Sequence, residues 1–221
     1  MRVVLSVAVV LGACATGNND AADSGTADAP IQIPIHDAAA ITTTLKQTDT
    51  TVASSQAIAC GSTISGWTAE NGWYRVFPLA DFAITTTFTV SDIGFAVEAS
   101  RGSQSVTIDV GTYAGTPGAE LDTALITSLA TTTVPIQPTM TPQLLSAPIA
   151  VMIPPSSNLV VELRAADHSN TTTYFYAGAS AGTETAPAYL RAPSCGADQP
   201  QTVKSFDPTA GSVIVTVTGS Y

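Results

Sequence analysis

Residues 67–78 read WTAENGWYRVFP and contain the strongest local signal for the fold. Asn71-Gly72 stands between two runs of residues that favour strands, and Asn-Gly in that setting is typical of a two-residue β-hairpin turn. Aromatic and β-branched residues in Trp73–Phe77 predict a strand, and Pro78 ends it because proline cannot donate to a hydrogen-bonded ladder. The stretch therefore predicts a hairpin that turns at Asn71-Gly72.

Short strands separated by turn residues continue from this stretch to the C-terminus. Residues 88–98 and 106–110 alternate between apolar and polar side chains, with Thr107 and Asp109 on the polar face of the second segment. Further runs of strand-forming residues lie near 124–134, 143–153, 159–163, 173–177 and 212–218. No segment of about ten or more residues carries the 3.6-residue period of an amphipathic helix. About nine strands at this spacing predict an all-β domain over residues 58–221, an antiparallel β-sandwich that we expect to be a jelly roll.

The composition combines few charges with many hydroxyl groups. Only 11% of the residues are charged, whereas about a quarter are charged in a typical soluble domain. Threonine supplies 33 of the 221 residues, and lysine occurs only at Lys46 and Lys204. The formal net charge of -10 excludes nucleic acid and anionic lipid as partners bound through charge, because both are negative. We expect a polar surface made largely of hydroxyl groups.

Residues 1–14 have the features of an export signal. A cationic start at Arg2 precedes an apolar run from Val3 to Leu11, which is typical of a secretory signal peptide. The run is far shorter than the roughly 20 residues that a membrane-spanning helix needs, so we do not expect a transmembrane anchor. One interpretation of the segment is an ordinary signal peptide with Cys14 buried or in a disulfide.

The end of the segment, Leu11-Gly12-Ala13-Cys14, resembles the lipobox of bacterial lipoproteins. The resemblance implies cleavage before Cys14, which makes residues 1–13 the signal peptide, and attachment of lipid to that cysteine. It implies a membrane partner held through acyl chains, in which each buried methylene contributes about 0.8 kcal/mol. Ala15, in place of aspartate, implies an outer-membrane lipoprotein of the bacterial cell envelope. Exposure at the cell surface is a further expectation.

Residues 14–57 are rich in Ala, Thr and Asp, which predicts a flexible tether before the folded domain. No aromatic residue occurs from Ala15 to Ala29, and such a segment cannot bury enough apolar surface to offset the entropy lost on ordering. Ile31–Ile35 alternates and is a candidate edge strand, because Pro34 is tolerated at the edge of a sheet.

If Cys14 carries lipid, Cys60 and Cys195 are the two cysteines left to form a disulfide. Two cysteines in an exported protein predict one disulfide, because the compartment is oxidising. Two free thiols and a bridge between molecules are the alternatives. For so long a loop the chain-entropy treatment gives about 5 kcal/mol of stabilisation as an upper scale. We do not expect a metal site, because cysteines so far apart offer no local pair of ligands.

Several motifs of the predicted domain resemble those of a known module. They are ENGWYRVFPL at 70–79, IGFAVE at 93–98, VVE at 160–162, TAPAYLRAPSCG at 185–196 and VIVTVTG at 213–219. These motifs and their spacing, over about residues 58–221, are similar to a β-sandwich accessory module of secreted and surface proteins of bacteria. The resemblance implies a sandwich with no established activity of its own.

Charged residues inside the predicted strands are conspicuous because the chain has so few. The candidates for ligand contacts are Trp67, Glu70, Trp73, Arg75, Glu98 and Glu162. In one interpretation the charges form ion pairs across strands, with Arg75 within reach of Glu98 or Glu162. In the other, carboxylates accept hydrogen bonds from a saccharide or peptide while a tryptophan stacks on a ring. Three tyrosines that could line a groove belong to this second interpretation, and they are Tyr174, Tyr176 and Tyr189.

We identify no catalytic residues, cofactor site or metal site in the sequence. A Gly-x-Ser-x-Gly pattern occurs at 178–182, but the only histidines, His36 and His168, both precede Ser180, whereas a nucleophile elbow needs a helix directly after it and a later histidine. We therefore expect a surface lipoprotein with a non-catalytic structural or interaction sandwich. The alternative is a module that binds a surface glycan or protein, which exposed aromatic side chains beside Glu70 or Glu98 would favour.

Overall fold

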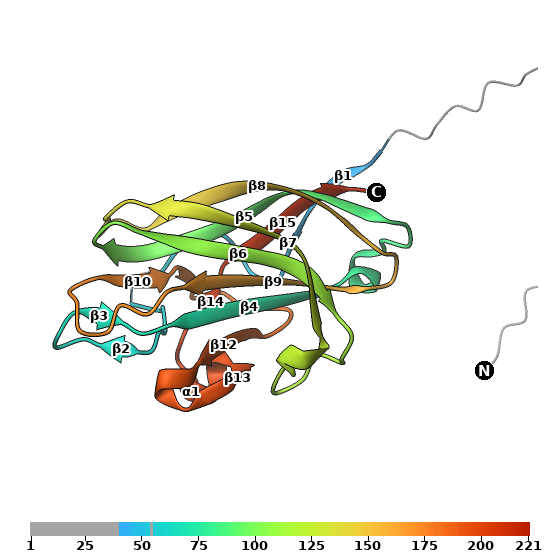
Figure 1. Cartoon of the computed structure of the whole chain (residues 1–221). Coiled ribbons are helices and arrows are strands. Elements are labelled where there is room, and N and C mark those ends of the chain that lie inside the picture. The colour runs from blue at the N-terminus through green and yellow to red at the C-terminus, as the bar shows by residue number, and fades with distance from the viewer. Residues whose placement is uncertain (1–39, 54) are drawn as a thin grey trace, which may run out of the picture. The chain divides into compact units, whose positions relative to one another are not determined.

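Two antiparallel β-sheets stack face to face in the computed structural model (Figure 1), which describes residues 40–53 and 55–221. The predicted all-β antiparallel sandwich is confirmed, while the jelly-roll arrangement stays a prediction. The described residues contain 15 strands, more than the predicted number of about nine. Four of them have only two residues each, which is too short for an alternating pattern to be recognised.

The larger sheet has six strands in the order β13-β12-β4-β9-β6-β7. Their bounds are Ala197–Thr202 (β13), Ala188–Ala192 (β12), Asn71–Pro78 (β4), Asn158–Ala165 (β9), Gln104–Tyr113 (β6) and Ile126–Ile136 (β7). All neighbours are antiparallel. Their register places Tyr74 of β4 opposite Glu162 of β9, and Glu162 opposite Asp109 of β6.

The smaller sheet has five strands, in the order β1-β15-β5-β10 with β8 also paired to β5. Their bounds are Thr42–Lys46 (β1), Val215–Ser220 (β15), Phe88–Arg101 (β5), Tyr174–Ala177 (β10) and Gln143–Ile153 (β8). β5 is long enough to pair with β8 along one edge and with β15 and then β10 along the other.

Short elements complete the described part of the chain. They are the two-stranded ladders β2 (Gly61–Ser62) with β3 (Trp67–Thr68) and β11 (Ala179–Ser180) with β14 (Ser212–Val213), the helix α1 (Val203–Phe206), and 3-10 helices at Leu79–Phe82, Thr123–Leu125 and Pro193–Cys195. Among the described residues, no helix combines the length and the apolar character needed to span a membrane.

Alternation along β4 separates the core between the sheets from a second cluster on the outer face of the larger sheet. Trp73 and Phe77 point into the core, whereas Tyr74 and Val76 point outward. The outward residues are buried as well, because Leu121 from the connection between β6 and β7 packs on them. β4 is therefore covered on both faces, which explains its almost continuous burial.

The predicted hairpin turn at Asn71-Gly72 is wrong, because both residues lie inside β4 and pair with β9. The Asn71 side chain is buried and holds the backbone of Cys60, accepting from its N–H and donating to its carbonyl. A Cβ atom at Gly72 would lie 2.6 Å from Oε1 of Glu162, so this glycine permits close packing. The turn lies earlier, between β2 and β3, where Gly66 adopts the positive φ of 69° that favours glycine.

The predicted boundary of the domain at residues 57/58 is also wrong. β1 pairs with the C-terminal strand β15, and Ala53 bridges to Ala179. Leu45 points into the core and is buried, and it is the one apolar residue of this threonine-rich strand. The sandwich therefore includes residues that the composition assigned to a tether. Residues 1–13, Cys14 and the candidate edge strand at 31–35 lie outside the described residues.

Candidate functional site

The predicted disulfide between Cys60 and Cys195 is confirmed, with Cα atoms 5.9 Å apart. It joins the segment before β2 to the 3-10 helix after β12. Cys60 is buried and Cys195 is exposed, so the bridge links the interior to the surface of the domain. Cys60 and Cys195 are therefore neither free thiols nor part of a bridge between molecules.

Trp73 and Arg75, two of the predicted ligand contacts, are fully buried and cannot meet a ligand at the surface. The Trp73 ring packs edge-on against Phe175, and its Nε1 donates to the carbonyl of Ile58. Trp67 is partly buried against the same core. These aromatic residues stabilise the interior, and none of them forms an exposed stacking platform.

Arg75 shares the inner face of β4 with Trp73 and Phe77, as its position in the strand predicts. The predicted ion pair with Glu98 or Glu162 is wrong, since Arg75 Nη1 lies 3.2 Å from Oε2 of Glu184. Glu162 is on the opposite face of the larger sheet. The partner that the structure provides comes from the segment between β11 and β12, which sequence alone does not place near β4.

Glu98 and Glu70 also have structural partners. The Glu98 carboxylate, on β5, accepts hydrogen bonds from the backbone N–H groups of Ser55, Gln56 and Ala57. This holds the segment before β2 against the smaller sheet. Glu70 forms an ion pair with Arg191, in which Oε1 and Nη1 are 2.7 Å apart and both side chains are partly exposed.

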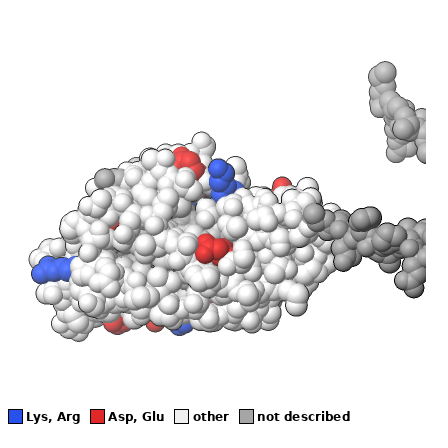
Figure 2. Space-filling view, turned by 90° about the horizontal axis from the view of Figure 1, so that it is seen from above, with Lys and Arg blue, Asp and Glu red and all other residues white. Residues whose placement is uncertain are grey.

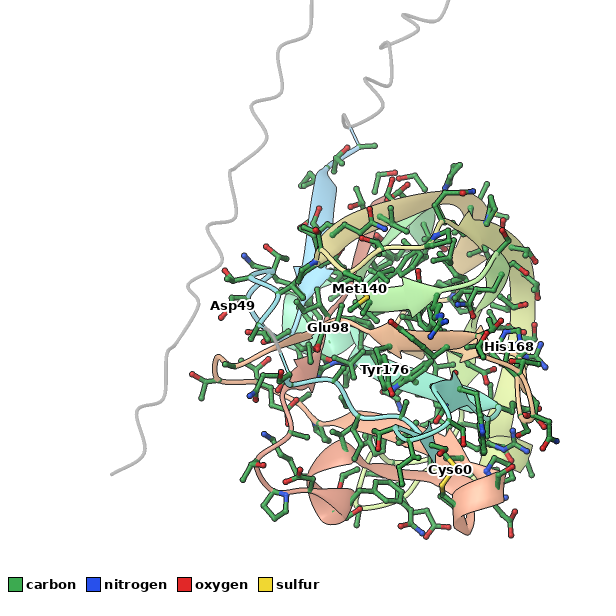
Figure 3. All side chains as sticks on the ribbon, turned by 90° about the vertical axis from the view of Figure 1, so that its left-hand side faces the viewer. Asp49, Cys60, Glu98, Met140, His168 and Tyr176 are labelled. Atoms are coloured by element: carbon green, nitrogen blue, oxygen red, sulfur yellow. A yellow bond between two sulfur atoms is a disulfide. The ribbon has the colours of Figure 1, made fainter. Side chains whose placement is uncertain are left out.

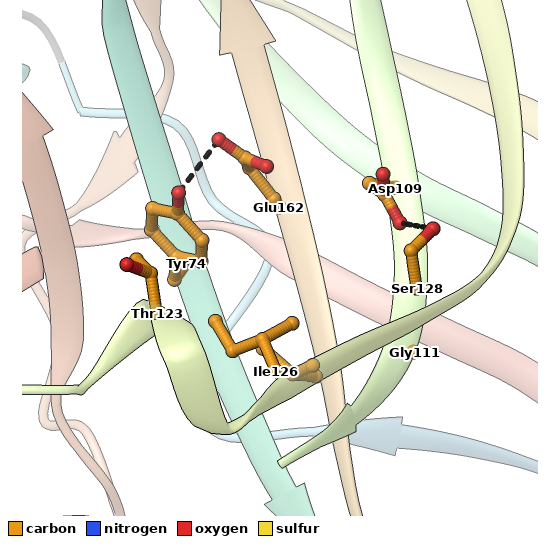
Figure 4. Close-up of a pocket in the computed structure, with 8 residues that line it drawn as sticks. Tyr74, Asp109, Gly111, Thr123, Ile126, Ser128 and Glu162 are labelled. Carbon is orange, nitrogen blue, oxygen red and sulfur yellow. Dashed lines mark hydrogen bonds between the residues drawn. The ribbon is translucent and has the colours of Figure 1, made fainter.

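Glu162 lines a pocket of about 170 Å³ on the outer face of the larger sheet (Figure 4). Tyr74 Oη donates to Glu162 Oε1 at 2.7 Å, and Ser128 Oγ of β7 donates to Asp109 Oδ1 at 2.6 Å. Ile126 contributes an apolar wall. The neighbouring carboxylates of Glu162 and Asp109 thus hold hydroxyl groups, and neither takes part in a salt bridge within the described residues.

Burial raises the pKa of Glu162 above the ordinary value for glutamate. The hydrogen bond from Tyr74 and the charge of Arg164 lower it, while the charge of Asp109 raises it, because like charges opposite each other on neighbouring strands repel. Burial and the charge of Glu162 raise the pKa of Tyr74 as well. The pocket therefore contains a neutral phenol and two crowded carboxylates, whose free lone pairs can accept hydrogen bonds from a donor.

A second hollow lies at the end of the smaller sheet that faces the viewer in Figure 3. Its volume is about 430 Å³, and Arg101, Met140 and Tyr174 are among its lining residues. Tyr176, two residues beyond Tyr174, is half-buried and lies near Glu98, as the labels in Figure 3 show. Burial raises the pKa of Tyr176, and Tyr174 and Glu98 act in the same direction.

Charge is sparse over the surface. Figure 2 shows isolated acidic and basic side chains separated by uncharged residues, without a large patch of one sign on the face displayed. Among the described residues, no group of three or more His, Cys, Asp or Glu side chains is arranged to hold a metal ion.

Ser180, the central residue of the Gly-x-Ser-x-Gly pattern, is buried in β11. Its Oγ donates to Oδ1 of Asp49 at 2.7 Å and accepts from the N–H of Gly182. These bonds fix the segment before β12 to the residues after β1, which accounts for the serine without a catalytic role.

Sequence reasoning missed Tyr74, Asp109 and Ser128 as members of the Glu162 pocket. Asp109 gave one usable signal, because aspartate is depleted in strands and Asp109 interrupts an otherwise apolar and threonine-containing segment. The other two could not be found without the register of the larger sheet. Comparison with protein-family models, curated proteins and solved structures gives no match for the chain.

Proposed function

We propose that this chain is a surface lipoprotein of the bacterial cell envelope whose sandwich is non-catalytic and serves a structural or interaction role. The observation that carries the proposal is the pairing of the cysteines. Cys60 and Cys195 bind each other, so Cys14 is the one remaining cysteine of the sequence. It stands directly after Leu11-Gly12-Ala13, in the position that lipidation requires in the lipobox it resembles.

Two further features support export. Disulfides persist in oxidising compartments outside the cytosol, and the Cys60–Cys195 bridge closes a long loop between two distant segments of the described domain. A surface with few charges and many threonines stays solvated without attracting anionic polymers. Both features suit a protein that faces the medium from a membrane anchor.

The test is metabolic labelling with a radioactive fatty acid in a bacterial host. The wild-type chain should incorporate label and fractionate with the outer membrane, and Cys14→Ser should lose both the label and the cleavage of the signal. Cys60→Ser is the matched control, because it removes a cysteine without touching the lipobox and should keep the label. Equal labelling of wild type and Cys14→Ser would contradict the proposal.

A second candidate function, binding of a saccharide or peptide at the cell surface, is favoured by one observation. The aromatic side chains of β10 are not all in the core, since Tyr174 and Tyr176 face outward and are partly exposed. Aromatic rings at a surface are the groups that stack on sugar rings. An array of glycans and peptides probed with the purified full chain would test this function.

A further inference from the structure

The alternation of β10 places two aromatic rings on the outside of the smaller sheet. Phe175 and Ala177 are buried in the core, whereas Tyr174 and Tyr176 face outward and are half-exposed. The two tyrosine rings have centroids 5.4 Å apart and an interplanar angle of 49°. The two rings are in tilted contact rather than stacked face to face, and they form a short aromatic surface along the strand.

Backbone hydrogen bonds fix the rim of this surface. Ser100 of β5 exchanges N–H and carbonyl bonds with Thr139, at 2.8 and 2.9 Å. This holds the turn between β7 and β8 over the end of the sheet and places Met140, with 76% of its surface exposed, beside Tyr174. The result is the hollow of about 430 Å³, which we call the β10 groove and define by Arg101, Thr139, Met140 and Tyr174. Tyr176 lies beside the groove, next to the Tyr174 ring.

The polar groups of the β10 groove have weak partners. Tyr174 Oη donates to the Met140 sulfur at 3.0 Å, and a thioether is a poor acceptor compared with an oxygen atom. Arg101 lies directly opposite Tyr174 in the sheet, is exposed, and forms no salt bridge among the described residues. A phenol and a guanidinium are thus both available to donate to a ligand that rests on the rings.

We propose that the β10 groove binds a saccharide, an inference that rests on the second candidate function given above. A sugar ring stacks on Tyr174 and Tyr176, and Arg101 and the Tyr174 hydroxyl donate to its oxygen atoms. The groove has the volume of a small-ligand site, which is typically about 300–1,000 Å³. The net charge of -10 disfavours an anionic polysaccharide at long range.

The Glu162 pocket is the competing site, and its chemistry differs. It is smaller, at about 170 Å³, and its phenol already donates to a carboxylate at 2.7 Å. It therefore presents acceptors but no free donor and no exposed aromatic face. Glu162→Gln changes the Glu162 pocket and leaves the β10 groove untouched. It is therefore the control for a ligand that binds in the Glu162 pocket instead.

The experiment uses the full chain in detergent micelles on an array that carries neutral, acidic and amino oligosaccharides beside synthetic peptides. The dissociation constant of the best-bound oligosaccharide is then measured by calorimetry. We expect Tyr174→Ala and Tyr176→Ala each to weaken binding about tenfold or more, which corresponds to about 1.4 kcal/mol. Tyr174→Phe keeps the ring and should weaken binding only a few-fold, and Glu162→Gln should leave binding unchanged. Thermal unfolding of each variant confirms that it is folded.

Other outcomes distinguish failure of the β10 groove as the binding site from failure of the second candidate function. An oligosaccharide that binds wild type, Tyr174→Ala and Tyr176→Ala equally would overturn the groove and leave the binding function standing, and loss in Glu162→Gln alone would move the site to the other pocket. Binding of peptides only would overturn the saccharide as ligand. If the wild-type chain binds nothing on the array, both the groove and the second candidate function are overturned.

Discussion

Replacement of Arg75 by alanine removes the most completely buried charge of the sandwich. The side chain is fully buried and donates four hydrogen bonds, two to the carbonyl of Val213, one to the carbonyl of Ala186 and one to Glu184. It therefore ties β4 to the segment before β12 and to β14. Burial lowers the pKa of Arg75, and the charge of Glu184 opposes that effect. An arginine in this position stays a cation at neutral pH.

We expect Arg75→Ala to lower the free energy of unfolding by about 3–5 kcal/mol, the usual cost of removing one partner of a buried pair. The carboxylate of Glu184, only 18% exposed, keeps its charge without a counter-ion. The carbonyl groups of Val213 and Ala186 lose their donors inside the protein, and an unpaired buried acceptor is itself costly. Arg75→Lys keeps the charge but loses the planar fork, so its effect should be intermediate.

Urea unfolding followed by circular dichroism measures the effect. With a denaturant slope of about 2 kcal/mol/M, the midpoint should fall by roughly 1.5–2.5 M. Arg191→Ala is the matched control, because its pair with Glu70 is partly exposed on both sides and should contribute under about 1 kcal/mol. The double variant Arg75→Ala/Glu184→Gln should be more stable than Arg75→Ala, since no charge is left unpaired. Equal, small losses for Arg75→Ala and Arg191→Ala would refute the reasoning.

Three further outcomes follow from the structure. Reduction of Cys60–Cys195 should lower the thermal midpoint by several degrees, with about 5 kcal/mol as the upper scale, and an unchanged midpoint would mean that the bridge does not stabilise the fold. Glu98→Gln should speed amide hydrogen exchange at residues 55–57, which mass spectrometry detects, while exchange in β4 should stay the same. For Glu162, whose pKa is raised above 4.5, the folded state binds protons more tightly than the unfolded state, so its contribution to stability falls as pH rises through that raised pKa. Glu162→Gln should flatten this dependence above pH 4.5, and an identical slope in wild type and variant would contradict it.

Strand existence was predictable from the sequence, whereas turn placement was not. The alternating patterns of 88–98 and 106–110 correspond to β5 and β6, because one face of each strand packs on a core. Asn71-Gly72 misled for a physical reason, because both residues serve packing and hydrogen bonding inside β4 rather than a turn. Gly72 leaves room for the Glu162 carboxylate, and Asn71 satisfies the backbone of Cys60. Local turn chemistry and long-range packing use the same residue types.

The partners of the charged residues could not be predicted, because they depend on contacts far along the chain. Alternation along β4 puts Arg75 on the same face as Trp73. A strand pattern cannot say which segment then covers that face, and Glu184 comes from an irregular segment between β11 and β12. The same limit applies to Glu98, whose partners are three backbone N–H groups and therefore leave no signature in side-chain identity.

The exposure of the aromatic residues in this sandwich depends on how many faces of their strand are covered. β4 is covered on both faces, so Trp73 and Tyr74 are both buried although they alternate. β10 is covered on one face only, so Phe175 is buried while Tyr174 and Tyr176 remain half-exposed. A core needs aromatic residues on the covered face alone. Two tyrosines lie on the uncovered face of this four-residue strand, beside Arg101, which lacks an ion-pair partner in the described residues. The proposal of saccharide binding rests on this arrangement.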